Sequence, residues 1–174
     1  PDIINPIGLA WDERGRLWVA ETVDYPNEMT LNRVGNDKIK ILEDADGDGK
    51  CDKVTVFAEG LNIPTSLTFS RGGIIVAHVP DFLFLKDTDG DDRVDSREVV
   101  LSGFDDHDTH HAISAFCADP SGAIFMGEGT FLHSNVETAY GTVRSSNGGF
   151  FRYNPKRRHL ERTVRLSIPN PWGI

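Results

Sequence analysis

The sequence DTHHAISAFCADPSGAIFMGEG (Asp108–Gly129) contains the pattern on which the fold prediction rests. A short apolar run leads into a tight turn that ends in glycine, and a second apolar run follows. Two hydrophobic segments joined by a glycine-containing turn are typical of a β-hairpin. The pattern recurs in NPIGLAWDERGRLWVAET (Asn5–Thr22) and IPTSLTFSRGGIIVAH (Ile63–His78), and NPWGI (Asn170–Ile174) begins a fourth copy.

The copies are spaced as structural repeats. Leu9, Leu67, Phe116 and Ile174 hold equivalent positions, at intervals of 58, 49 and 58 residues. Further strand-like segments follow each hairpin, such as the alternating run Lys38–Glu43, so each unit predicts four antiparallel strands. Four-stranded units repeated around an axis form a β-propeller of typically four to eight blades. In the third unit, Thr130–Asn147 is expected to be a long connection.

The predicted fold is therefore an all-β propeller domain over residues 1–174. Blade 1 spans about 5–60, blade 2 about 61–104 and blade 3 about 108–168, and 169–174 is the first strand of a fourth blade. Three blades cannot close a ring and would leave strand edges exposed. We expect a part of a longer six- or seven-bladed propeller, with a short chain that closes by oligomerisation as the alternative.

Composition excludes some classes of function. The formal net charge of −9 argues against a nucleic-acid surface, because affinity for phosphate depends on Lys and Arg. The basic cluster Lys156–Arg158 follows Asn154-Pro155 and is expected to be a solvated turn. No apolar run approaches the about 20 residues that span a bilayer. Cys51 and Cys117 do not form a disulfide framework.

Two acidic segments, DADGDGKCD (44–52) and DTDGDDRVD (87–95), have the ligand spacing of a calcium loop. The first has Thr55 at position 12, where the pattern expects an acid, and the second has Asp92 at position 6, where it expects glycine. The alternative is that the Asp-Gly pairs only make turns, although close carboxylates repel one another without a cation. The predicted ligands, with backbone carbonyls from the two basic residues, are Asp44, Asp46, Asp48, Lys50 and Asp52, and Asp87, Asp89, Asp91, Arg93, Asp95 and Glu98.

Propeller topology separates these loops from a second group of polar residues. The acidic loops are outer hairpin turns, whereas the starts of the first strands and the ends of the second strands lie on the opposite face. Glu21, His78 and Glu128 end the second strands there. Glu21 and Glu128 could anchor a polar substrate or only cap their strands, and all three residues are candidates for cofactor binding.

The segment DDHDTHH (Asp105–His111) also belongs to this face and allows three interpretations. It could bind a metal ion, since His and Asp are common ligands. It could be a solvated acidic loop. It could supply a general base, because an imidazole held by Asp105, Asp106 or Asp108 accepts a proton from a bound hydroxyl group. The candidate catalytic residues are His111, His110 and Asp108, with His111 favoured because it adjoins the first strand of its unit.

Several motifs together carry a family resemblance: GLAWDERGRLWVAETVDYP, KIKILEDADGDGKCDKVTVFAEGL, FLKDTDGDDRVDSREVVLSGF, the His-His strand and NPWGI. The chain resembles the N-terminal domain of the bacterial "putative membrane-bound dehydrogenase" family, which are large and generally exported proteins. That domain is similar to the soluble quinoprotein glucose/aldose dehydrogenases, six-bladed propellers that use pyrroloquinoline quinone (PQQ) and calcium.

The resemblance implies a function for several residues. His111 matches the catalytic base of the quinoprotein enzymes, which takes a hydroxyl proton while hydride moves to PQQ. Asn170 matches a cofactor-binding Asn-Pro run, but Pro169 stands where those enzymes carry an arginine. The implied protein is a periplasmic or extracellular sugar or alcohol dehydrogenase, with membrane association left open, that passes electrons to a c-type haem domain. The alternatives are a non-catalytic calcium-stabilised propeller that binds a glycan or a partner protein, and a propeller lactonase.

Overall fold

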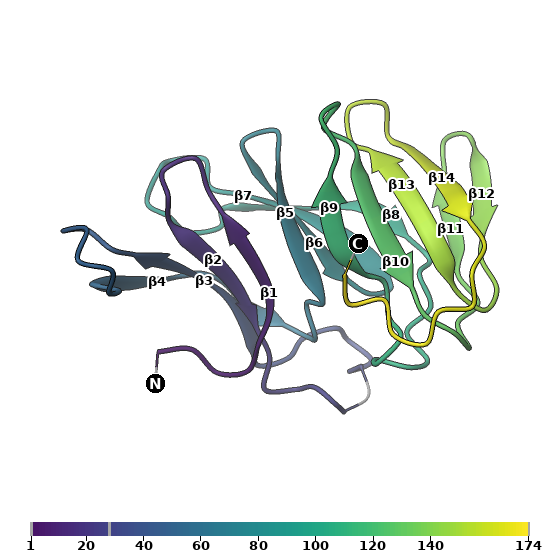
Figure 1. Ribbon diagram of the computed structural model, residues 1–174, viewed down its shortest axis with the longest axis horizontal. Helices are drawn as coiled ribbons and strands as arrows, with labels where there is room; N and C mark the ends of the chain where they lie inside the picture. The colour runs from purple at the N-terminus through teal and green to yellow at the C-terminus, as the bar shows by residue number, and fades with distance from the viewer. Residues whose placement is uncertain (1, 28, 174) are drawn as a thin grey trace.

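Fourteen β-strands form the described part of the protein in a computed structural model, and residues 2–27 and 29–173 contain no helix. The strands form three antiparallel sheets (Figure 1). The first sheet has the order β1 (Pro6–Trp11), β2 (Leu17–Glu21), β3 (Asp37–Glu43), β4 (Lys53–Leu61). No described helix is long and apolar enough to cross a membrane.

The second and third sheets follow the same plan, with one addition. The third has the order β14 (His159–Val164), β13 (Gly149–Asn154), β10 (Ile124–Glu128), β9 (Ser114–Ala118). The second has the order β12 (Gly141–Arg144), β11 (Asn135–Thr138), β8 (Ser96–Ser102), β7 (Asp81–Lys86), β6 (Gly73–His78), β5 (Ser66–Ser70). Strand β1 lies beside β5, and β5 beside β9, so the first strands of the three sheets are neighbours. The fold is all-β and propeller-like, as predicted.

The extra pair β11–β12 corrects the predicted long connection at 130–147. This segment forms a hairpin that joins the edge of the second sheet through the pair Glu137↔Ser102. Only Val136 of strand β11 is apolar, and it is fully buried in the core between the second and third sheets. Such a short strand has too little hydrophobic alternation to be detected from the sequence.

Residues 169–173 form no strand, and Ile174 lies outside the described residues. Pro169 and Pro171 cannot donate ladder hydrogen bonds. Instead the Ser114 hydroxyl donates to the Pro171 carbonyl at 2.9 Å, which holds this segment against β9.

The core lies in two layers, one on each side of the second sheet. Side chains alternate between faces along a strand, and β6 shows this directly. Ile74 and Val76 enter the layer against the first sheet, while Ile75 and Ala77 enter the layer against the third. The continuous apolar run in β6 is therefore that of a strand covered on both faces.

Candidate functional site

Strand ends divide the molecule into two faces. The hairpin turns β1–β2, β5–β6 and β9–β10 lie along one face, the turn face, at the top of Figure 1. Strands β3 and β7 start at the opposite face and run toward the turn face. The acidic loops 44–52 and 87–95 follow the ends of these strands and therefore lie on the turn face. The connections β2–β3, β8–β9 and β10–β11 meet on the other face, the connection face.

Contacts between sheets show that the connections meet. Arg33 of the β2–β3 connection forms an ion pair with Asp106 of the β8–β9 connection. The Tyr25 and His110 rings lie 5.1 Å apart between the same two segments. The Gly129 amide, after β10, donates to the His111 carbonyl at 2.8 Å. The predicted histidine segment thus contacts residues that follow strands of the first and third sheets.

His111 and Asp108 form a hydrogen-bonded pair. Nδ1 of His111 lies 2.8 Å from Oδ2 of Asp108, and the His111 side chain is 13% exposed. His110 is 54% exposed, and its Nδ1 lies 3.4 Å from the other oxygen of Asp108. Burial raises the pKa of Asp108, but hydrogen bonds from the His111 ring and the His110 amide outweigh burial and hold it below its usual value. Asp108 is therefore ionised at neutral pH and orients the His111 ring.

The second ring nitrogen of His111 is not fully buried. Nε2 has no hydrogen-bond partner among the described residues, and it is not one of the buried atoms that lack a partner. The ring packs edge-on to Phe131 and against the backbone of Gly129, where an added Cβ would lie 2.8 Å from that of His111. This arrangement fixes the ring and leaves one nitrogen available for a proton from a ligand.

Glu21, His78 and Glu128 lie on the same face but are buried. Glu21 pairs with the Lys40 ammonium at 2.8 Å. His78 Nε2 accepts the Asn62 amide proton at 3.0 Å, and burial lowers the pKa of this imidazole. Glu21 thus joins two strands of the first sheet, and His78 joins the end of β6 to the β4–β5 connection.

Glu128 has a different environment from the other two. One of its oxygens accepts a hydrogen bond from the Ser134 hydroxyl, while the other is buried without a partner among the described residues. Burial raises the pKa of Glu128, and the bond from Ser134 offsets this only in part. Asn170, the fourth predicted cofactor-binding residue, is exposed.

Asp37 is a central residue of the connection face that the sequence analysis missed. Its buried carboxylate accepts hydrogen bonds from Val23, Asp24, Thr22 and Ile63. The sequence shows only an aspartate at the start of an alternating strand, which gives no sign of these long-range partners.

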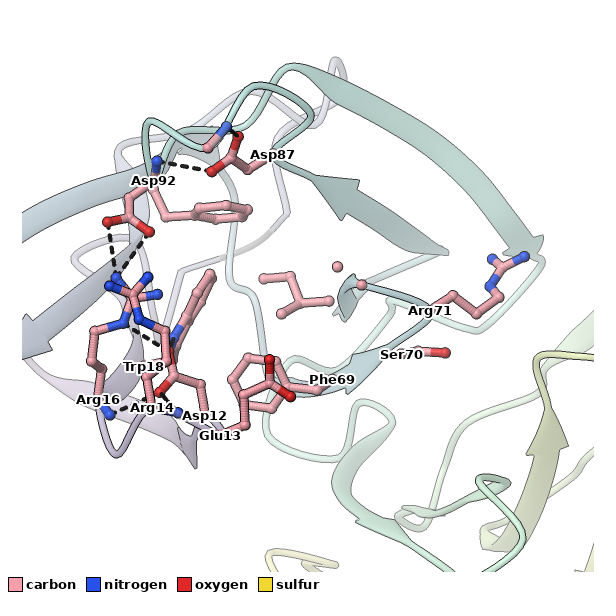
Figure 2. A pocket seen from close by; sticks show the side chains of 15 residues that line it. Asp12, Glu13, Arg14, Arg16, Trp18, Phe69, Ser70, Arg71, Asp87 and Asp92 are labelled. Carbon is pink, nitrogen blue, oxygen red and sulfur yellow. Dashed lines mark hydrogen bonds and ion pairs between the residues drawn. The ribbon is translucent and has the colours of Figure 1, made fainter.

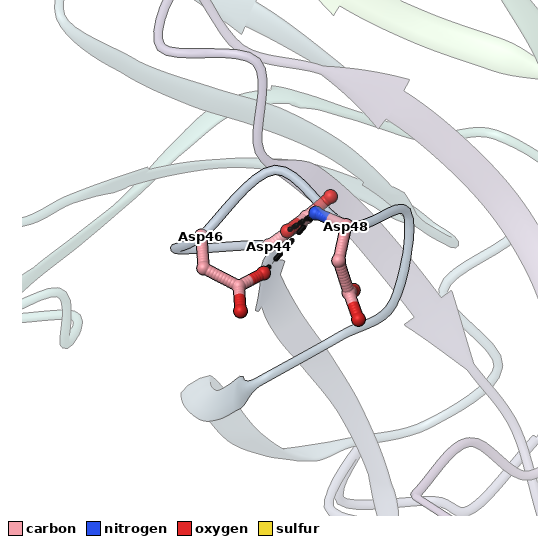
Figure 3. A group of neighbouring side chains, drawn as sticks. All are labelled: Asp44, Asp46 and Asp48. Carbon is pink, nitrogen blue, oxygen red and sulfur yellow. Dashed lines mark hydrogen bonds between the residues drawn. The ribbon is translucent and has the colours of Figure 1, made fainter.

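The first acidic loop gathers three of its predicted ligands. Carboxylate oxygens of Asp44, Asp46 and Asp48 lie within 4.8 Å of one another (Figure 3). Backbone amides of Gly47 and Gly49 donate to Asp44 at 2.7 and 2.8 Å. Oxygens that share one Ca²⁺ at 2.3–2.6 Å lie at most about 5 Å apart, so the group fits this cation. Asp52 instead accepts the Ala45 amide, and the Lys50 ammonium contacts Asp48 at 2.8 Å.

The second acidic loop gathers Asp87, Asp89 and Asp95 within the same 4.8 Å. Asp91 is outside this group and accepts the Arg93 amide. Glu98 lies in β8, with its carboxylate 3.1 Å from the Arg158 guanidinium. Each loop therefore brings three carboxylates together in a geometry that suits a hard cation.

Three of the four predicted cofactor-binding residues do not fit PQQ. The carboxylates of PQQ need cationic or N–H donors. Glu21 and Glu128 carry carboxyl groups, which do not supply such donors in their ionised form. Nε2 of His78 is already engaged as an acceptor of the Asn62 amide proton. The cations Arg33 and Lys40 are already paired with Asp106 and Glu21.

Two clefts in the described residues are not lined by His111. One of about 540 Å³ lies on the turn face between the first two sheets (Figure 2). One of about 300 Å³ lies between β1, β5, β9 and the segment Trp172–Gly173.

Comparison with known proteins places the chain in a family without assigning an activity. No curated protein matches it. A solved structure from Thermus thermophilus, described as a "putative oxidoreductase (glucose dehydrogenase)", is 22% identical with a TM-score of 0.44. The alignment covers 71% of this chain and 39% of that one, and a likeness at this level says nothing about activity. A family model matches residues 1–174, and the chain therefore belongs to the family described as a domain of unknown function, DUF7133.

Proposed function

We propose that this chain is part of a dehydrogenase-like propeller that oxidises a hydroxyl group of a sugar or another alcohol. The observation that supports it best is the Asp108–His111 pair on the connection face. A carboxylate on Nδ1 fixes the tautomer of the ring and leaves Nε2 as the proton acceptor. The family resemblance of the same segment points to the same chemistry.

The proposed step removes a proton from the hydroxyl group and a hydride from the carbon that carries it, and each goes to a different acceptor. His111 Nε2 would take the hydroxyl proton, and the hydride of the carbon would have to pass to a two-electron acceptor that the described residues do not hold. Asp108 stabilises the resulting imidazolium and stays ionised. Because Glu21, Glu128 and His78 do not fit PQQ, no step is assigned to that cofactor. A haem domain as the next acceptor and an exported location belong to the same proposal.

Calcium in the two acidic loops is the structural part of this proposal. Three carboxylates held within 4.8 Å repel one another, and a divalent cation removes that repulsion. Both loops lie on the turn face, away from His111, so this calcium supports the fold and does not contact the substrate.

A second candidate is a non-catalytic, calcium-stabilised propeller that binds a glycan or a partner protein. The burial of Glu21, His78 and Glu128 favours it, because these three residues of the connection face then serve the fold.

The test is an assay on the protein that carries this chain, supplied with calcium and PQQ. Dye reduction is measured with a panel of sugars and alcohols, for the wild type and His111→Ala. A general base contributes about 10²–10⁴-fold, so His111→Ala should lower kcat by that factor. His107→Ala, in the same loop but outside the pair, is the matched control and should keep activity. Equal activity in wild type and His111→Ala would refute the assignment, and no activity in any protein would favour the second candidate.

A further inference from the structure

The second acidic loop is joined to the neighbouring sheet. The Val94 amide donates to the Phe57 carbonyl of β4 at 2.9 Å, and the Val94 side chain packs against the core between the first two sheets. Just beyond the loop, the Arg97 guanidinium donates to the Glu59 carbonyl at 2.9 Å. The loop of the second sheet is thus attached to the outer strand of the first.

Arg16 makes the strongest of these contacts. It lies between β1 and β2, and one guanidinium nitrogen donates to both oxygens of Asp92 at 2.9 and 2.8 Å (Figure 2). Its Nε donates to Asp12 at 2.8 Å, and Asp12 also accepts the Trp18 indole N–H at 3.0 Å. The Arg16 side chain is only 8% exposed, so this network is largely removed from solvent.

Asp92 connects this network to the candidate calcium ligands. It stands at position 6 of the loop with φ of 64°, a left-handed conformation that favours glycine. Its amide donates to Oδ2 of Asp87 at 2.8 Å, while its carboxylate holds Arg16. One residue therefore contacts a candidate calcium ligand through its backbone and the neighbouring sheet through its side chain.

The first loop has no such connection. Its position 6 is Gly49, with φ of 85°, whose amide donates to Asp44 in the same way. In the described part of the chain, the hydrogen bonds and ion pairs of residues 44–52 stay within the loop and the strands that adjoin it. Each loop thus gathers three carboxylates, and the two loops differ in what the sixth residue reaches.

We propose that calcium in the second loop and the Arg16–Asp92 contact stabilise each other. Of the two acidic loops, only the second then strengthens the attachment of the first sheet to the second. The coupling rests on the calcium binding proposed above. It also accounts for a non-glycine residue at position 6, where the side chain is needed for the contact between sheets.

The sign of the effect separates this coupling from simple charge repulsion. Arg16 is a positive charge close to the loop, so Coulomb repulsion alone predicts that its removal tightens calcium binding. Coupling predicts the opposite, because without Arg16 the Asp92 backbone loses the support that orients Asp87. Arg16→Lys keeps the charge but loses the two-oxygen contact of one guanidinium.

The experiment is a calcium titration by isothermal calorimetry in an Asp44→Asn background, which disables the first loop. Arg16→Met and Arg16→Lys should each weaken the remaining site by about tenfold, within the usual range for coupled sites. Arg14→Met is the matched control, since Arg14 is an exposed cation of the same turn, and it should bind as the background does. Circular dichroism checks that each variant is folded, and Arg16→Lys serves as the milder change.

Each outcome has a separate meaning. Absence of calcium binding in the wild type overturns the calcium assignment together with the coupling. Calcium binding that is unchanged or tighter in both Arg16 variants overturns the coupling and leaves the calcium assignment standing.

Discussion

Replacement of Asp37 by asparagine should destabilise the protein far more than a loss of one surface charge. Asp37 begins β3 and is 1% exposed. One of its oxygens accepts the amides of Val23 and Asp24 at 2.7 and 3.1 Å. The other accepts the Thr22 hydroxyl at 2.7 Å and the Ile63 amide at 2.6 Å. The carboxylate thereby joins the β2–β3 connection to the segment that enters the second sheet.

The size of the effect follows from these four donors. In the better orientation, the new NH₂ group replaces the oxygen that faces Thr22 and Ile63. The Thr22 hydroxyl can rotate to accept, but the Ile63 amide is left buried without an acceptor, at a cost of about 1–3 kcal/mol. The two remaining bonds lose charge assistance, about 1 kcal/mol each. The expected loss is therefore about 3–5 kcal/mol, and a 4 kcal/mol loss lowers Tm by about 8–16 °C in a chain of this size.

Urea unfolding measures the loss, followed by tryptophan fluorescence and by circular dichroism. Asp2→Asn is the matched control, since Asp2 is exposed and the change should stay within about 0.5 kcal/mol. A loss for Asp37→Asn within 1 kcal/mol of the control would refute the reasoning.

Three further predictions concern protonation and calcium. Burial raises the pKa of Glu128, so the folded state holds its proton more tightly than the unfolded state does. The free energy of unfolding of the wild type, relative to Glu128→Gln, should therefore fall as the pH rises from 4.5 through the pKa of Glu128 in the folded state. Urea unfolding at a series of pH values measures this difference. Burial lowers the pKa of His78, so stability should fall as the pH drops below 6.5, and His78→Gln should lack this component in the same series. Chelation of calcium should lower Tm in differential scanning calorimetry, and an unchanged Tm would contradict calcium binding; excess calcium should restore the original value.

The sequence predicts the repeat architecture because each hairpin carries its own local signal. Glycines at the turns, such as Gly15 and Gly122, and apolar runs on both sides define β1–β2 and β9–β10 without reference to the rest of the chain. The hairpin β11–β12 was missed because its formation depends on the edge of β8, which is distant in the chain.

Ligand spacing was informative for the calcium loops because the candidate ligands are close in sequence. The structure brings three carboxylates together in each loop, but it pairs Glu98 with Arg158. Arg158 lies 60 residues away, so spacing alone could not indicate this partner.

The connection face was less predictable for the same reason. The Asp108–His111 pair is local and was proposed from the sequence, whereas the partners of Asp37 and the burial of Glu128 depend on contacts between distant segments. Position at a strand end does not distinguish a residue that faces a ligand from one that caps its own sheet.

Anomalous diffraction from crystals soaked with terbium, a calcium substitute, tests the division into two faces most directly. The account predicts two peaks on the turn face, one at Asp44, Asp46 and Asp48 and one at Asp87, Asp89 and Asp95, and none beside His111. A peak at the His110–His111 segment, or none in the acidic loops, would contradict it.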